Sequence, residues 1–139
     1  MEERAMKKGV IVLILLGLLQ LVPVDRSNPP VKAGFFGPDR VEEILRRSCY
    51  DCHSYETRWP WYSRVAPVSW MVAHNVKEAR AELNFSEWRT YGSAKRAEIG
   101  AEMIDLIEKN EMPPPLYAVM HGATRLSGAE LEVLRNWQP

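Results

Sequence analysis

Apolar residues recur at helical spacing in four stretches of the chain, and no stretch alternates with period two long enough to predict a strand. The first stretch, residues 39–48, runs directly into two cysteines. Its inward positions fall at i, i+3, i+4 and i+7, and are Val41, Ile44, Leu45 and Ser48. We expect a helix here with Asp39 as its N-cap, because an Asp side chain accepts hydrogen bonds from free amides of the first turn.

Two longer helices are predicted in the middle of the chain, at residues 69–83 and 93–109. Each has an apolar stripe on one face. The first stripe is Val68, Met71, Val72, Val76, Ala79 and Leu83, and the second is Ile99, Met103, Leu106 and Ile107. Residues 113–115 are all proline, so the second of these helices must end before them.

The last helix has the clearest start. Ser127 and Glu130 form an S-x-x-E capping box, and Leu126 with Leu131 forms a hydrophobic staple. The part of the chain beyond the N-terminal segment is therefore predicted to be all-α, with four short helices. Its connections, such as the aromatic residues 54–67, are long for a small domain, which is typical of functional loops.

The N-terminus follows a different pattern. Residues 9–24 carry no charge, and Arg4, Lys7 and Lys8 precede them. Sixteen residues is slightly short of the roughly 20 that span a bilayer. The basic residues predict an N-terminus in the cytoplasm. We expect an uncleaved membrane-anchor helix; the alternative is a cleaved signal, for which residues 31–33 offer a cleavage site.

Composition changes this picture little. The chain has 139 residues and equal numbers of acidic and basic side chains, 18 of each, so one domain and no nucleic-acid partner are expected. We divide it into an export or anchor segment (1–24), a linker (25–37) rich in proline and glycine, and a folded domain (38–139). Four of its five tryptophans lie between residues 59 and 88, which suggests a core built around a flat group.

The only cysteines, Cys49 and Cys52, form the motif C-x-x-C-H with His53. A redox disulfide of this spacing belongs after a strand, and none is predicted. A zinc site needs further ligands, and His53, His74 and His121 do not form a pair of the usual spacing. The remaining interpretation is attachment of one c-type haem, with both thiols bonded to its vinyl groups and His53 as the proximal iron ligand.

The opposite face of such a haem needs a ligand, a water or a substrate. Met71 and Met103 lie on helix stripes, where core packing explains them. Met112 stands on a stiff Met-Pro segment that would hold its thioether at little entropic cost. We expect Met112 to be the sixth ligand, with His74 and His121 as alternatives.

Several further stretches carry a resemblance that spans roughly residues 22–137. They are SNPPV, CYDCHS, TRWPWYSRVAPVSW, LNFSEW, MPPPLY and H-x-A-x-x-L-S-x-x-E. Together they resemble the bacterial haem-binding domain family with a single C-x-x-C-H motif, and the order of motifs is similar to that of small class I c-type cytochromes. The resemblance implies a cytochrome c-like helical fold around one haem held by Cys49 and Cys52, with His53 and Met112 as iron ligands. Ala79 stands where the family pattern suggests glycine.

The chain that follows the motif offers four candidates to line the haem edge: Arg58, Trp59, Trp61 and Tyr62. A guanidinium, indole N–H groups and a phenol suit the propionates, which need donors and positive charge. An ordinary aromatic cluster explains the same residues equally well.

These observations predict a one-electron carrier on the outer side of a bacterial inner membrane, held through residues 9–24 and facing the periplasm or cell exterior. Its partners would be redox proteins of the respiratory or periplasmic chain. A cleaved leader would instead leave a soluble periplasmic protein. The rival function is a haem enzyme or gas sensor with an open sixth position, and a third is a haem module of a larger complex.

Overall fold

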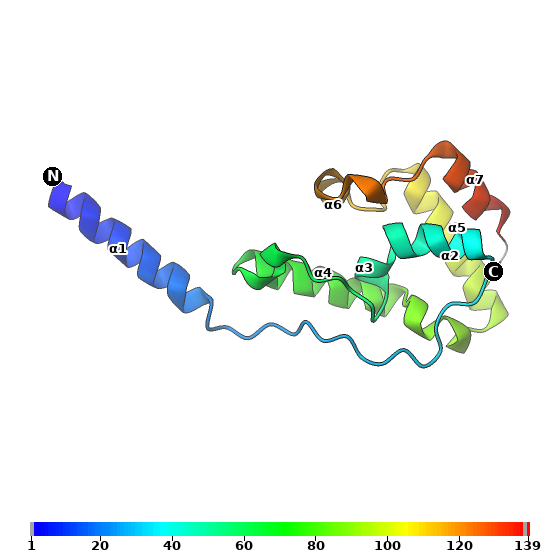
Figure 1. Ribbon diagram of the computed structural model, residues 1–139, viewed down its shortest axis with the longest axis horizontal. Coiled ribbons are helices and arrows are strands. Elements are labelled where there is room, and N and C mark those ends of the chain that lie inside the picture. The colour runs from blue at the N-terminus through cyan, green and yellow to red at the C-terminus, as the bar shows by residue number, and fades with distance from the viewer. Residues whose placement is uncertain (1, 138) are drawn as a thin grey trace.

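A computed structural model describes residues 2–137 and 139 (Figure 1). These residues form seven α-helices, three short 3-10 helices and no strand. The α-helices are α1 (Glu2–Leu19), α2 (Asp39–Ser48), α3 (Tyr50–His53), α4 (Val68–Glu82), α5 (Ser93–Glu108), α6 (Pro115–Met120) and α7 (Gly128–Asn136), and the 3-10 helices are η1 (Trp61–Arg64), η2 (Phe85–Thr90) and η3 (Gly122–Thr124). The prediction of a small all-helical domain is confirmed.

The four helices predicted within the domain correspond to α2, α4, α5 and α7. The capping box of α7 is confirmed, because the Ser127 side chain accepts from the Glu130 amide while the Glu130 carboxylate accepts from the Ser127 amide. The N-cap predicted for α2 is wrong. Pro38 occupies that position and Asp39 lies inside the first turn, where its charge still favours the helix dipole.

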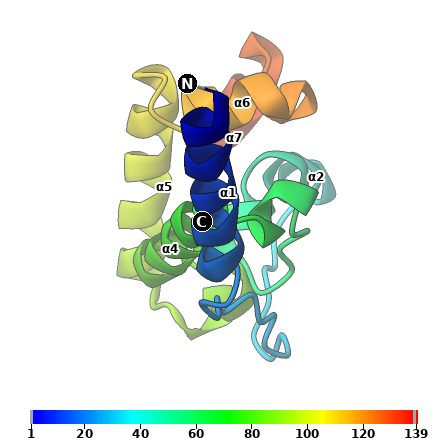
Figure 2. The same cartoon turned by 90° about the vertical axis from the view of Figure 1, so that its left-hand side faces the viewer.

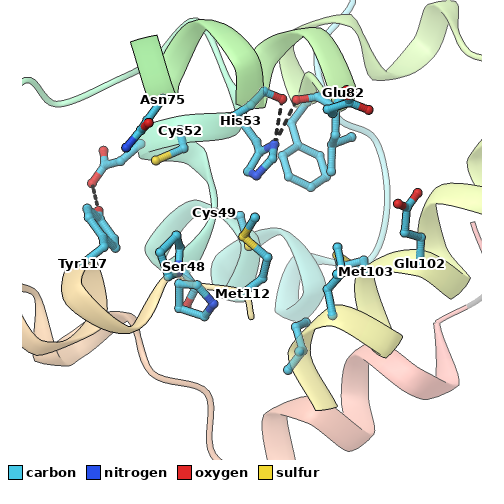
Figure 3. A pocket seen from close by; sticks show the side chains of 18 of the residues that line it. Ser48, Cys49, Cys52, His53, Asn75, Glu82, Glu102, Met103, Met112 and Tyr117 are labelled. Atoms are coloured by element: carbon cyan, nitrogen blue, oxygen red, sulfur yellow. Dashed lines mark hydrogen bonds between the residues drawn. The ribbon is translucent and has the colours of Figure 1, made fainter. Parts of the chain in front are cut away.

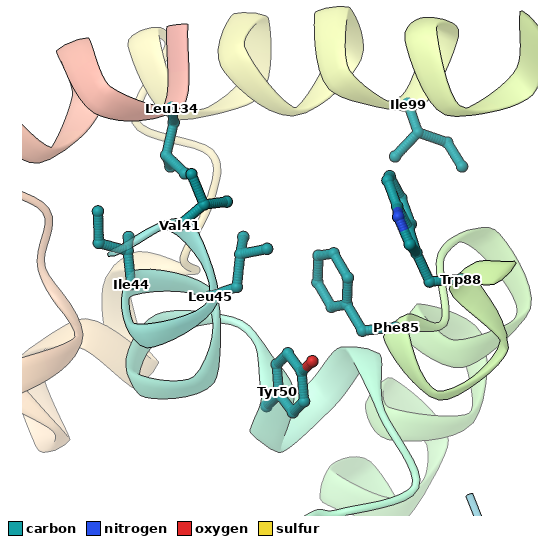
Figure 4. Close-up of a cluster of buried hydrophobic side chains, with 8 residues drawn as sticks. All are labelled: Val41, Ile44, Leu45, Tyr50, Phe85, Trp88, Ile99 and Leu134. Atoms are coloured by element: carbon teal, nitrogen blue, oxygen red, sulfur yellow. The ribbon is translucent and has the colours of Figure 1, made fainter. Parts of the chain in front are cut away.

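The core forms where α2 meets η2, α5 and α7 (Figure 4). Its largest members are Phe85 and Trp88 of η2, each about 1% exposed. Tyr50 of α3 stacks on Phe85 with ring centroids 5.3 Å apart. The remaining core residues are Val41, Ile44, Leu45, Ile99 and Leu134. The cysteine motif therefore sits on a rigid base, since α3 is packed directly against this core.

A partly buried ion pair joins α7 to α2. The Glu130 carboxylate accepts two hydrogen bonds from the Arg47 guanidinium, at 2.6 and 3.0 Å. These bonds, together with the Ser127 amide, lower the pKa of Glu130 to about 2. The pair fixes the last turn of α2, which leads into Cys49.

Residues 25–37, predicted as a linker, contain no helix but contact the domain along their length. Asn28 donates to the Thr57 carbonyl at 2.9 Å, and the Ala33 carbonyl accepts from the Arg89 amide at 3.0 Å. Phe35 packs against Trp88 and Trp137. This segment therefore contributes a side chain to the core cluster.

Helix α1 stands away from the rest of the molecule (Figure 1) and buries none of its residues. Its apolar side chains are exposed from Val10 to Leu18. None of the helices described here combines the length and the apolar character needed to cross a bilayer.

Candidate functional site

The motif Cys49-Tyr-Asp-Cys-His forms a single helical turn. The Cys49 carbonyl accepts from the amides of Cys52 at 3.1 Å and His53 at 2.9 Å. Cys49 is at once the C-cap of α2 and the N-cap of α3. This turn brings Cys49, Cys52 and His53 to the wall of one cavity.

The cavity has a volume of about 530 Å³, within the range of roughly 300–1,000 Å³ that small-molecule and cofactor pockets occupy. It lies between α3, α4, α5 and the start of α6, and Figure 3 shows the side chains around it. Most of its wall is apolar, from Leu83, Phe85, Ile99, Met103, Leu106, Ile107, Met112, Pro113 and Leu126. A large and mostly apolar group fits such a space.

His53 is held in one orientation inside this cavity. Its Nδ1 atom lies 3.0 Å from the Ala79 carbonyl oxygen and 3.1 Å from that of Leu83, as the dashed lines in Figure 3 show. Carbonyl oxygens only accept hydrogen bonds, so Nδ1 carries the proton and Nε2 keeps its lone pair. Burial lowers the pKa of His53, against the effect of these two bonds. The ring is thus a neutral imidazole with Nε2 available to a metal.

Both cysteines are free thiols. Burial raises the pKa of Cys49 to about 12, and Cys52 nearby adds to the effect. Burial and the Asp51 carboxylate raise the pKa of Cys52 to about 11. Redox-active cysteines need a lowered pKa, so these values oppose a redox pair. Among the residues described, no cluster of three or more His, Cys, Asp or Glu side chains is placed to hold a metal ion.

Met112 reaches the same cavity because of the way α5 ends. Asn110 adopts φ 58°, and the Glu111 amide bonds back to the Leu106 carbonyl at 2.9 Å, as in a Schellman motif. The Met112 amide bonds to the same carbonyl at 3.2 Å. This turn reverses the chain and leaves the Met112 side chain half-buried on the cavity wall.

A family model described as a haem-binding domain matches residues 14–139, nearly the whole chain. The chain belongs to the haem-binding domain family. The resemblance noted in the sequence is confirmed. No curated protein and no solved structure matches the chain.

The residues present fit a haem. A haem-binding domain needs apolar walls for the macrocycle, and an axial ligand with a free lone pair; the cavity supplies both. The two thiols lie on the same cavity and match the C-x-x-C spacing. We refer to this space below as the haem cavity.

Of the three residues considered as sixth ligand, the structure places only Met112 on the haem cavity. His74 is exposed and lies beside a second cavity, of about 390 Å³, on another face of α4. His121 stacks on Tyr117 with ring centroids 4.3 Å apart. Met103, which the helical stripe assigned to the core, also lines the haem cavity and packs against the core cluster.

The four residues expected at the haem edge do not line the haem cavity in this structure. Arg58 forms an ion pair with Asp51, and Trp61 is 77% exposed. Trp59 lines the second cavity, and the Tyr62 hydroxyl lies 3.5 Å from His121. None of them is among the described residues that line the haem cavity. Their proposed contact with propionates remains a prediction.

Sequence reasoning missed several residues of the site. Tyr117 lines the haem cavity and donates a 2.8 Å hydrogen bond to Asp51, the third residue of the cysteine motif. Four carboxylates line the cavity: Asp51, Glu78, Glu82 and Glu102. No Lys or Arg among the described residues does so. The spacing of residues 75, 78, 79 and 82 could have predicted part of this wall, because positions i, i+3, i+4 and i+7 share one face of a helix.

Proposed function

We propose that this haem-binding domain carries one covalently attached c-type haem and acts as a one-electron carrier with a cytochrome c-like arrangement. Cys49 and Cys52 form the thioether links, His53 is the proximal ligand and Met112 the distal one. The observation that carries the proposal is the bond from His53 Nδ1 to Ala79 and Leu83, because it orients a free Nε2 into the cavity shared with both thiols.

Each residue has a defined task in this arrangement. The two carbonyl acceptors fix the tautomer of His53 and strengthen its Nε2 as a donor to iron. Apolar walls from Phe85 and Leu106 exclude water. Met112 would be the second iron ligand, which would leave no position for a substrate. The bound haem supplies the reversible one-electron couple.

The proposal includes a membrane location. The apolar segment 9–24 would attach the domain to the outer side of a bacterial inner membrane, facing the periplasm or cell exterior. The exposed apolar side chains of α1 support this, since contiguous exposed apolar surface marks contact with a membrane or a protein. Redox proteins of the respiratory or periplasmic chain would then exchange electrons with it.

An absorption spectrum tests the function. The full chain is produced together with haem-attachment machinery, and the spectrum is recorded in both oxidation states, with and without carbon monoxide. We expect low-spin iron with a c-type reduced spectrum and no rapid binding of carbon monoxide. High-spin iron that binds carbon monoxide at once would contradict an electron carrier and support an open-site enzyme or sensor.

Covalent attachment is read separately from the same preparations. Denaturing gels stained for haem should show the haem on the wild-type chain, less on Cys49→Ser, and none on the variant with both cysteines changed to serine. Haem that stays with the double variant after denaturation would contradict the thioether links. This experiment does not depend on the identity of the sixth ligand.

A further inference from the structure

One end of the domain exposes an apolar surface that the haem site does not use. Two segments form it: residues 61–71, from η1 into α4, and helix α6. The contact between the Tyr62 hydroxyl and the His121 ring joins them. Figures 1 and 2 show that both lie at the end of the domain nearest α1. The exposed apolar side chains are Trp61, Val65, Val68, Met71, Leu116, Val119 and Met120. We call this set the apolar end.

The charged side chains that belong to the segments of the apolar end are basic. The chain as a whole has 18 acidic and 18 basic residues, yet residues 57–71 and 112–129 contain no Asp or Glu. Their charged residues are Arg58, Arg64 and Arg125. Arg58 is paired with Asp51, which also contacts Tyr117 of α6, while the other two are exposed. Apolar and basic groups together fit an anionic lipid surface better than a neutral protein surface.

The apolar segment of α1 ends at this same place. Gln20, the residue after α1, donates to the Ala66 carbonyl at 3.3 Å and accepts from the Ala66 amide at 2.9 Å. Ala66 lies between η1 and α4. Arg26 adds a bond to the Ser63 carbonyl at 3.2 Å. These contacts fix the end of the apolar segment beside Trp61 and Val65.

We propose that the apolar end rests on an anionic lipid membrane, with Trp61 in the interfacial zone and Leu116 and Val119 among the outer acyl segments. Tryptophan favours this zone because its ring is apolar and its N–H is polar. The proposal extends the membrane attachment given above: the domain itself contacts lipid, in addition to the segment 9–24.

This contact sets the direction of the haem cavity. Helix α4 begins at Val68, at the apolar end, and carries its acidic residues Glu78 and Glu82 in its last two turns. Those carboxylates line the haem cavity. With Val68 toward the lipid, Glu78 and Glu82 face the aqueous side, where anionic headgroups do not repel them.

Hydrogen–deuterium exchange on the full-length holoprotein tests the contact. It is measured in detergent, with phosphatidylcholine vesicles, and with vesicles that also contain phosphatidylglycerol. We expect the anionic vesicles to slow exchange in residues 61–71 and 115–120. The triple variant Trp61→Ser, Leu116→Gln, Val119→Gln should lose this protection. The matched control is Phe36→Ser, because Phe36 is 78% exposed but belongs to the segment that enters α2, and Figure 1 shows α2 at the end of the domain away from α1.

The experiment distinguishes failure of this inference from failure of the anchor. Protection of residues 2–19 without protection of 61–71 and 115–120 would overturn the inference and leave the anchor standing. Protection of the apolar end alone would support the inference and contradict the membrane anchor. Unprotected segments throughout would overturn both. Protection that depends on protein concentration and not on vesicles would assign the apolar end to a second copy of the chain and overturn lipid contact.

Discussion

The Nδ1 atom of His53 lies 3.0 Å from the backbone carbonyl oxygen of Ala79, near the C-terminal end of α4. The same carbonyl also accepts from the Leu83 amide at 3.0 Å, and the C-terminal end of a helix carries partial negative charge, so this end stabilises an N–H donor. A strengthened imidazole favours ferric over ferrous iron, so α4 would both orient His53 and tune the iron if His53 is the ligand as proposed.

Enlarging Ala79 should disturb haem binding, because Ala79 lines the haem cavity next to the His53 ring. We expect Ala79→Leu to lower the haem content of purified protein, measured as the ratio of Soret to protein absorbance. Ala81→Leu is the control, since Ala81 is exposed on the same helix. Equal haem content in the two variants would contradict the placement of His53 against α4.

The two cavity methionines should differ in their spectra. Met112→Ala removes the proposed sixth ligand, so the weak red charge-transfer band of methionine-ligated ferric haem should disappear. Met103→Ala should keep that band and destabilise the fold by about 2 kcal/mol, the low end for a Met-to-Ala change, because Met103 is only half-buried. Both are measured by absorption and thermal unfolding. Loss of the band in Met103→Ala alone would transfer the ligand role to Met103.

Local patterns predicted much of this fold. Helix α2 follows from the spacing of Val41, Ile44 and Leu45, and the start of α7 from its capping box, because both depend on residues within a few positions. The C-x-x-C-H motif likewise carries its own geometry. The N-cap of α2 was mistaken because Pro38 also starts a helix well, with its fixed φ of −60°.

The rest of the site depends on contacts between distant residues. The acceptors for His53 are backbone carbonyls 26 and 30 residues away, which no side-chain pattern reveals. Trp88 joins the core whereas Trp61 is exposed, although both are aromatic residues near helix ends. The sequence also did not show which face of α5 lines the cavity, because Met103 contacts both the core cluster and the cavity.

The half-buried thiols should resist alkylation in protein made without haem. Burial raises the pKa of Cys49 to about 12 and that of Cys52 to about 11, from an ordinary 9.0. The thiolate is the reactive form, so iodoacetamide should react slowly at pH 8 and faster as pH rises toward 11. Mass spectrometry follows the reaction, with the urea-unfolded chain as control. Rapid alkylation of the folded chain at pH 8 would instead favour a redox role.

The ion pair between Glu130 and Arg47 should dominate the acid sensitivity of the fold. Glu130→Gln removes the charge that accepts both guanidinium bonds, and we expect a loss of about 1–3 kcal/mol in the free energy of unfolding at pH 7. Glu132→Gln is the matched control, because Glu132 lies on the same helix and is exposed. Urea unfolding monitored by circular dichroism measures both variants.

The pH dependence gives the sharper result. The pKa of Glu130 is about 2 in the folded chain and 4.5 ordinarily, so its contribution is fully present above about pH 4.5 and is lost as pH falls toward 2. The wild-type chain should therefore lose stability over this window more steeply than Glu130→Gln, and the two curves should converge near pH 2. Parallel curves from pH 5 to pH 2 would mean that Glu130 has an ordinary pKa in the folded state and that its bonds to Arg47 do not tie α7 to the helix that carries the cysteine motif.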